Sequence, residues 1–170
     1  RYAMLSSQYR KHINVGKVIP SMAHRLIITM GGSDISNQTL TILETISRND
    51  LSSTEIVVVV GPTNPHLEAL EEFAMSTETN IVIRHNVDDM SSILKWSDIS
   101  INAGGSTCWE MAFMGVPMII VTVAENQKTI AESLAAEGAA VNLGPHEHID
   151  YHLIPKLLKD ILQDSKKRGS

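Results

Sequence analysis

The chain has 170 residues, of which 43% are hydrophobic, and its 14 basic and 19 acidic side chains give a formal charge of −5. A negative chain lacks the positive surface that non-specific nucleic-acid binding requires, and the basic stretch 166–168 is too short to change this. No apolar run approaches the ~20 residues of a membrane span, and the single cysteine, Cys108, allows no intrachain disulfide, as expected of a cytoplasmic protein.

Short apolar runs rich in β-branched residues recur along the chain. They predict β-strands over residues 25–29, 55–60, 80–84, 98–102, 117–121 and 139–143. The central runs are apolar at every position, as in Ile-Val-Val-Val-Val at 56–60. Strands of this kind are buried on both faces, which is typical of a parallel sheet covered by helices.

The segments between these runs carry helix signals. Asn64 followed by Pro65 predicts an N-cap and a first helical turn. Asp88 is positioned to cap a helix over 89–96. These signals make the chain alternate between strand and helix.

The C-terminal part continues the alternation. A helix starting near Gln127 is expected to end at Gly138, and a last amphipathic helix is expected over about 151–163. Repeated strand–helix alternation predicts an open α/β domain, a doubly wound, Rossmann-like parallel sheet of about six strands.

The alternation also suggests domain boundaries. Residues 1–23 do not follow it and are interpreted as a linker from a missing N-terminal domain, 24–163 form the α/β domain, and 164–170 form a disordered tail. The chain starts at Arg1 without a charged-then-apolar leader, so we expect a piece of a longer protein.

Two glycine-containing loops follow predicted strands, at the sheet edge where α/β proteins bind ligands. Gly104, Gly105, Ser106 and Thr107 are expected to run directly into a helix over 108–114. Unpaired backbone N–H groups and the helix dipole make such a turn suited to phosphate. The alternative is that the glycines serve only a tight turn.

Gly31, Gly32 and Ser33 follow the first strand and are expected to open a second helix at the same edge. Two such loops suit a diphosphate better than one. Neither loop is a Walker A or GxGxxG motif, so the loops alone name no nucleotide.

Glu110 has two interpretations. Thr107 and Glu110 have the spacing of a capping box, in which the glutamate reaches back to a backbone N–H, and on pattern alone this is favoured. The other interpretation, a ligand contact, depends on the resemblance described below.

Other candidates are weaker. His146-Glu147-His148 is an isolated loop pair, the chain has no paired metal-ligand spacing, and we predict neither a metal nor a cofactor. Cys108 at a helix start could be reactive, but a buried structural thiol is favoured because no partner base is evident. Asp88 and Asp89 are better explained by a helix cap than by paired catalysis.

The stretch Gly-Gly-Ser-Thr-Cys-Trp-Glu-Met-Ala at 104–112, continuing through Gly-Val-Pro at 115–117 to Ala-Glu-Asn-Gln at 124–127, resembles the UDP-sugar hydrolases of pseudaminic acid biosynthesis. These are grouped with spore-coat polysaccharide proteins, in the wider superfamily of GT-B glycosyltransferases. The segments 31–34, 86–90 and 2–5 fit in the same order. The resemblance thus implies the C-terminal domain of a GT-B fold, with 24–163 as a UDP-sugar-binding domain.

The resemblance also implies residue roles. Glu110 would hold the ribose hydroxyls, which overturns the preference for a cap alone, and the backbone near Val87 would take the uracil edge. The diphosphate would be held by Gly32, Ser33, Ser106 and Thr107 beside Gly104 and Gly105, and Asn126 and Gln127 would face the sugar.

The implied reaction is release of UDP from a deoxy-diacetamido sugar in surface-polysaccharide or nonulosonic acid biosynthesis. The histidine credited with assisting water lies in the N-terminal domain of that family, so no catalytic residue is expected in this chain. The expected partners are UDP or a UDP-sugar and that N-terminal domain. Two alternatives remain: the donor-binding domain of a GT-B glycosyltransferase, and a non-catalytic nucleotide-binding module.

Overall fold

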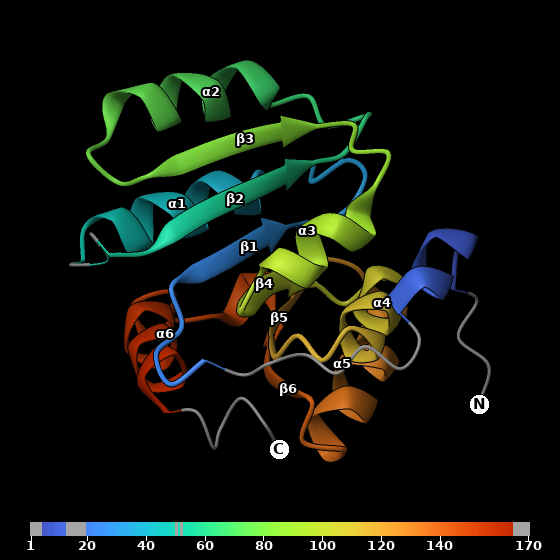
Figure 1. Ribbon diagram of the computed structural model, residues 1–170. Coiled ribbons are helices and arrows are strands. Elements are labelled where there is room, and N and C mark those ends of the chain that lie inside the picture. The colour runs from blue at the N-terminus through green and yellow to red at the C-terminus, as the bar shows by residue number, and fades with distance from the viewer. Residues whose placement is uncertain (1–4, 13–19, 50, 52, 165–170) are drawn as a thin grey trace.

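The computed structural model describes residues 5–12, 20–49, 51 and 53–164. Its centre is a six-stranded sheet in which every pairing is parallel, with the order β3-β2-β1-β4-β5-β6 (Figure 1). The strands are β1 Arg25–Thr29, β2 Glu55–Val60, β3 Ile81–His85, β4 Ile99–Ala103, β5 Met118–Thr122 and β6 Ala140–Pro145. The predicted doubly wound sheet is confirmed, with the first two strands as predicted and the other four starting one residue later.

Helices cover both faces of the sheet (Figure 1). One core cluster joins the strands to α1 Gln38–Ser47, α2 Leu67–Ser76 and α6 Leu153–Gln163. The other joins them to α3 Met90–Trp96, α4 Thr107–Phe113 and α5 Lys128–Ala136. The alternation of side chains along β1 explains the two layers: Leu26 and Ile28 lie in the first cluster and Ile27 in the second.

The helix after β1 does not begin at the glycines, so the prediction that residues 31–33 open it is wrong. It begins at Gln38, because Asp34 (φ 41°) and Asn37 (φ 51°) adopt left-handed backbone conformations that interrupt a helix. The Asp34 carboxylate accepts from the backbone N–H groups of Gln38 and Thr39 at 2.8 and 2.9 Å. Asp34 therefore caps α1 from within the loop.

Two other predicted helix starts shift. Asp89, not Asp88, caps α3, accepting from the backbone N–H of Ser92 at 3.2 Å. The helix predicted from Asn64 begins at Leu67, because Asn64 closes a turn by accepting from the His66 N–H at 2.8 Å. A side chain that bonds two residues ahead can form a turn as well as a cap.

The later helix ends match their signals. Helix α5 stops where Gly138 adopts a φ of +76° and Ala139 donates to the Leu134 carbonyl at 2.9 Å. A left-handed glycine of this kind ends helices because it lacks a Cβ. Helix α6 begins at Leu153, with Pro155 buried in its first turn.

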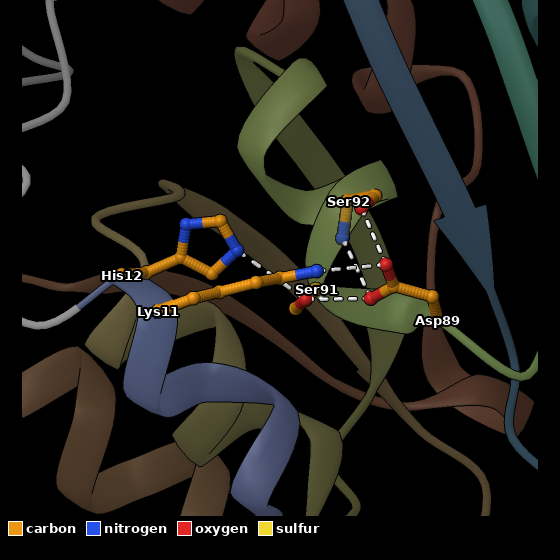
Figure 2. A network of polar contacts seen from close by, with 5 residues as sticks. All are labelled: Lys11, His12, Asp89, Ser91 and Ser92. Atoms are coloured by element: carbon orange, nitrogen blue, oxygen red, sulfur yellow. Dashed lines mark hydrogen bonds and ion pairs between the residues drawn. The ribbon is translucent and has the colours of Figure 1, made fainter.

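The first described segment, η1 (Ser7–His12), packs on α3 and α4 at the same side of the sheet as the strand ends (Figure 1). Figure 2 shows its polar contacts: Lys11 Nζ lies 2.9 Å from the Asp89 carboxylate, and His12 Nε2 lies 3.3 Å from Ser91 Oγ. Tyr9 is buried, with its ring edge-on to Phe113 of α4. Of the segment 2–5 that carried part of the resemblance, residues 2–4 lie outside the described residues.

Candidate functional site

A cavity of about 590 Å³ lies beyond the carboxyl ends of β1, β4 and β5. Three chain segments and the start of η3 (His146–His148) enclose it. The described lining consists of Met30, Gly31, Gly32, Ser33, Asp34, Ile35, Ser36, Gly105, Ser106, Thr107, Val123, Ala124, Gln127 and His146. The two glycine loops, separated by about seventy residues of sequence, thus face one space.

The topology explains this position. The strand order reverses between β1 and β4, because β1 connects to β2 on one side while β4 leads to β5 on the other. Loops that leave adjacent strands toward opposite faces separate and open a crevice, which is where ligands bind in doubly wound sheets.

The Gly31–Ser33 loop is held by the end of β2. Thr63 donates to the Gly32 carbonyl through its backbone N–H at 3.2 Å and its hydroxyl at 2.9 Å. Gly31 has a φ of +85°, which favours glycine, and Gly61 lies so close that a Cβ there would be 2.4 Å from the Gly32 oxygen. Gly61, which sequence reasoning did not single out, is therefore a structural requirement of this loop.

In the second loop, the two adjacent glycines do different things. A Cβ on Gly104 would lie 2.9 Å from the Gln127 carbonyl oxygen, so Gly104 is required for packing and does not line the cavity. A Cβ on Gly105 would meet nothing within 4 Å, so this position is open toward a ligand. The amides of Ser106 and Thr107 have no acceptor among the described residues, so both can donate to an anion.

A buried polar chain supports the second loop from beneath. Asn102 donates through Nδ2 to the Ala103 carbonyl at 2.9 Å and to Cys108 Sγ at 3.1 Å. Ser100 Oγ donates to Asn102 Oδ1 at 3.0 Å. Because Ala103 and Cys108 flank the turn, Asn102 ties its two ends together.

Cys108 is the buried structural thiol that the sequence favoured. It is fully buried, and burial raises the pKa of its thiol to about 11, against a weaker lowering by Asn102. A protonated, enclosed thiol is a poor nucleophile.

Glu110 lies outside the cavity lining. Helix α4 starts at Thr107 with no side-chain cap at its N-terminus, so the capping-box interpretation is wrong. Burial first, and the neighbouring Glu110 carboxylate second, raise the pKa of the Tyr9 hydroxyl far above its usual range. The Tyr9 hydroxyl lies near the Glu110 carboxylate but has no hydrogen-bond partner among the described residues. Glu110 is half-buried and borders η1.

The remaining predicted residues fall into two groups. Gln127 lines the cavity but its side-chain Oε1 accepts from the Val123 N–H at 2.8 Å, which fixes the loop after β5. Asn126 is exposed and Val87 is half-buried, and neither lines the cavity.

Sequence reasoning set His146 aside as part of an isolated pair, but the structure places it in the cavity lining. The next two residues, Glu147 and His148, line a neighbouring cavity of about 320 Å³ with Glu125 and Lys128. Within the described residues, no group of three His, Cys, Asp or Glu side chains is arranged to hold a metal ion.

The sequence of the sheet and both loops matches one family. Residues 26–169 match the glycosyltransferase family 28 C-terminal domain. The chain belongs to this family. Its sheet is that of the C-terminal domain of a GT-B glycosyltransferase fold, as the resemblance implied.

Relatives of this family 28 domain include biosynthetic proteins. It is 27% identical over 134 residues to the spore coat polysaccharide biosynthesis protein SpsG of Bacillus subtilis (strain 168), a match covering 75% of this chain and 39% of SpsG. It is 28% identical over 125 residues to the UDP-N-acetylglucosamine--N-acetylmuramyl-(pentapeptide) pyrophosphoryl-undecaprenol N-acetylglucosamine transferase of Leuconostoc citreum (strain KM20), covering 69% of this chain and 34% of that protein. The family 28 domain thus spans well under half of either relative.

A solved structure shares the fold. Spinosyn rhamnosyltransferase SpnG complexed with thymidine diphosphate matches with a TM-score of 0.64 and 23% identity, covering 90% of this chain and 43% of SpnG. Among the described helices of the family 28 domain, none has the length and apolar character of a membrane span.

Proposed function

We propose that this chain is the nucleotide-binding half of an enzyme that breaks the bond between the sugar and the diphosphate of a UDP-sugar. One observation carries the proposal: in a family 28 C-terminal domain, the loops after β1 and β4 converge on a single cavity. Ser33, Ser106 and Thr107 add hydroxyl groups to its wall.

This lining suits a diphosphate. Negative charge grows on the diphosphate as the sugar leaves, and fixed backbone N–H groups stabilise that charge without having to reorganise. The open position at Gly105 lets a phosphate approach the amides of Ser106 and Thr107. We assign the diphosphate to Gly32, Ser33, Gly105, Ser106 and Thr107.

The nucleoside is assigned by the resemblance and not by the cavity. Glu110 would accept hydrogen bonds from the ribose hydroxyls and the backbone at Val87 would take the uracil edge. For Glu110 to reach a ribose, its carboxylate must turn away from Tyr9, because the two are neighbours in this structure. Asn126 and Gln127 would face the sugar at the loop after β5.

Hydrolysis and transfer both remain open for the whole enzyme. The resemblance to the pseudaminic acid hydrolases favours release of the sugar to water. Membership of a glycosyltransferase family and the similarity to the Leuconostoc transferase favour transfer to an acceptor. UDP release by the full-length protein, measured with and without acceptor lipid or saccharide, separates them: release that requires an acceptor rules out the hydrolase.

Nucleotide binding is tested on the 170-residue chain by isothermal titration with UDP, thymidine diphosphate and ATP. We expect UDP to bind more tightly than the other two. Amide shifts in ¹H–¹⁵N spectra should concentrate at Gly32, Ser33, Gly105 and Ser106, with Met75 of α2 unchanged as the internal control. Absence of UDP binding at millimolar concentration, or shifts spread away from these loops, would contradict the proposal.

A further inference from the structure

His146 is the one side chain in the described cavity lining that can become positively charged. The described lining contains no lysine or arginine, and its other ionisable member, Asp34, is acidic. Asp34 is buried and its carboxylate is engaged by the N–H groups of α1. A diphosphate placed there therefore meets backbone amides, hydroxyls and a single candidate cation.

The position of His146 is fixed by its surroundings. Gly144 turns the chain with a φ of +85°, and its N–H donates to Asn142 Oδ1 at 2.9 Å. The Tyr151 hydroxyl donates to Gln38 Oε1 of α1 and lies 3.4 Å from the His146 carbonyl. The backbone that carries His146 is thus connected to the helix that follows the Gly31–Ser33 loop.

The charged groups around His146 come from three elements. Glu147 Oε1, on the same turn, lies 3.3 Å from His146 Nε2. Asp34 lines the same cavity from the β1–α1 loop. Burial first, and then the charges of Asp34 and Glu147, raise the pKa of the Tyr151 hydroxyl. Lys128 of α5, which pairs with Glu125 at 2.7 Å, also interacts with Glu147. The described charged groups around His146 are therefore mostly acidic.

We propose that His146 binds the diphosphate of the nucleotide as the one side-chain cation of the described lining, donating a charge-assisted hydrogen bond to a phosphate oxygen. The proposal rests on the proposed function, since it deepens the same site. Histidine gains its charge between about pH 5 and 8, so the contact is stronger at the acidic end of that range. Binding of the diphosphate would move Nε2 from Glu147 to the phosphate.

The test compares His146→Gln with His148→Gln in the 170-residue chain. His148 lies two residues further on but lines the neighbouring cavity, so it is the matched control. Titration with UDP and with uridine at pH 6 and pH 8 separates the diphosphate from the nucleoside. The protonation of UDP itself is common to all variants and cancels in the ratio to wild type.

We expect His146→Gln to weaken UDP binding about tenfold at pH 6, with a smaller effect at pH 8 and none on uridine, because a charge-assisted hydrogen bond contributes of that order. His148→Gln should leave all four affinities unchanged. His146→Lys, which keeps a cation, should restore UDP binding at pH 8. Thermal unfolding of each variant shows that it is folded.

The outcomes distinguish the two proposals. If wild type binds UDP and His146→Gln binds it equally well at both pH values, His146 has no such role and the proposed function stands. The same conclusion follows if His146→Gln weakens UDP and uridine equally, because the effect is then not on the diphosphate. If the wild-type chain binds no UDP, the proposed function is contradicted, and the role of His146 is contradicted with it.

Discussion

The side-chain amide of Asn102 lies 3.1 Å from the sulfur of Cys108 and 2.9 Å from the carbonyl oxygen of Ala103. One buried amide thereby joins the strand before the Gly104–Thr107 turn to the helix after it. Ser100, buried on the same strand, holds the amide from behind and also donates to the Pro117 carbonyl at 3.2 Å. The shape of the turn depends on a residue that is buried and does not line the cavity.

Asn102→Ala should weaken UDP binding beyond what its effect on stability explains. The substitution removes three hydrogen bonds, two donated to Ala103 and Cys108 and one accepted from Ser100, which costs about 1–3 kcal/mol of unfolding free energy. UDP affinity should fall several-fold while uridine affinity is unchanged, as measured by calorimetry. Ser97→Ala, equally buried but with its hydroxyl bonded to the Leu94 carbonyl at the end of α3, away from the turn, is the control and should lose stability alone. Equal loss of UDP binding in both variants would falsify the positioning role.

Gly61→Ala should lower the stability of the chain, whereas Gly105→Ala should weaken UDP binding. A methyl group at 61 would overlap the Gly31–Gly32 backbone, so the unfolding free energy should fall by about 1–3 kcal/mol or more, the usual cost of overpacking. A methyl group at 105 meets no protein atom, so stability should change little while UDP binding weakens. Chemical denaturation and titration of the two variants check this. A stable Gly61→Ala chain, or unchanged UDP affinity in Gly105→Ala, contradicts the geometry described for the respective loop.

Glu110→Ala tests the ribose assignment. If the carboxylate accepts from the ribose hydroxyls, UDP binding should weaken by about 1–3 kcal/mol, and the loss should be smaller for 2′-deoxy-UDP. If Glu110 serves only the contact with Tyr9, stability changes and affinity does not. Tyr9→Phe, which keeps the ring against Phe113 and removes only the hydroxyl, is the control. Unchanged UDP affinity in Glu110→Ala removes Glu110 from the site.

Cys108 should make the chain less stable in alkali. The folded-state pKa of about 11 lies above the ordinary value of 9.0, so the thiolate forms first in the unfolded chain. The stability that the protonated Cys108 thiol contributes is intact below pH 9 and is lost as the pH rises through about 11. Chemical denaturation should show that the free energy of unfolding falls more between pH 8 and pH 10 for wild type than for Cys108→Ser. Thiol labelling at pH 8 should proceed at the unfolding rate; rapid labelling of the folded chain would show an accessible thiol.

The sequence predicted the sheet because its signal is local. Runs such as 56–60 are apolar on both faces, and only strands buried between two helix layers tolerate that pattern. The glycine loops were predicted for the same reason, since the residues that turn the chain lie next to the strands they end. The cap of α3 was misplaced by one residue because Asp88 and Asp89 offer the same side chain at adjacent positions.

What the sequence could not assign depends on contacts between distant segments. His146 is about forty residues from Gly105 in the chain, and only the strand order β1-β4-β5-β6 brings them to one cavity. The need for Gly61 comes from the approach of a second loop, and the roles of Gly104 and Gly105 differ because one faces Gln127 and the other faces open space.

By itself, then, the sequence determined a parallel sheet, its helices, and the edge at which ligand loops emerge, because hydrophobic period and turn residues act over a few neighbours. The tertiary structure decided which loops share a cavity, which glycine a ligand can approach, and that Asp34 caps a helix. Those outcomes depend on how strands separated in the chain are paired, and the pairing is set by burial of the whole core and not by any local run of residues.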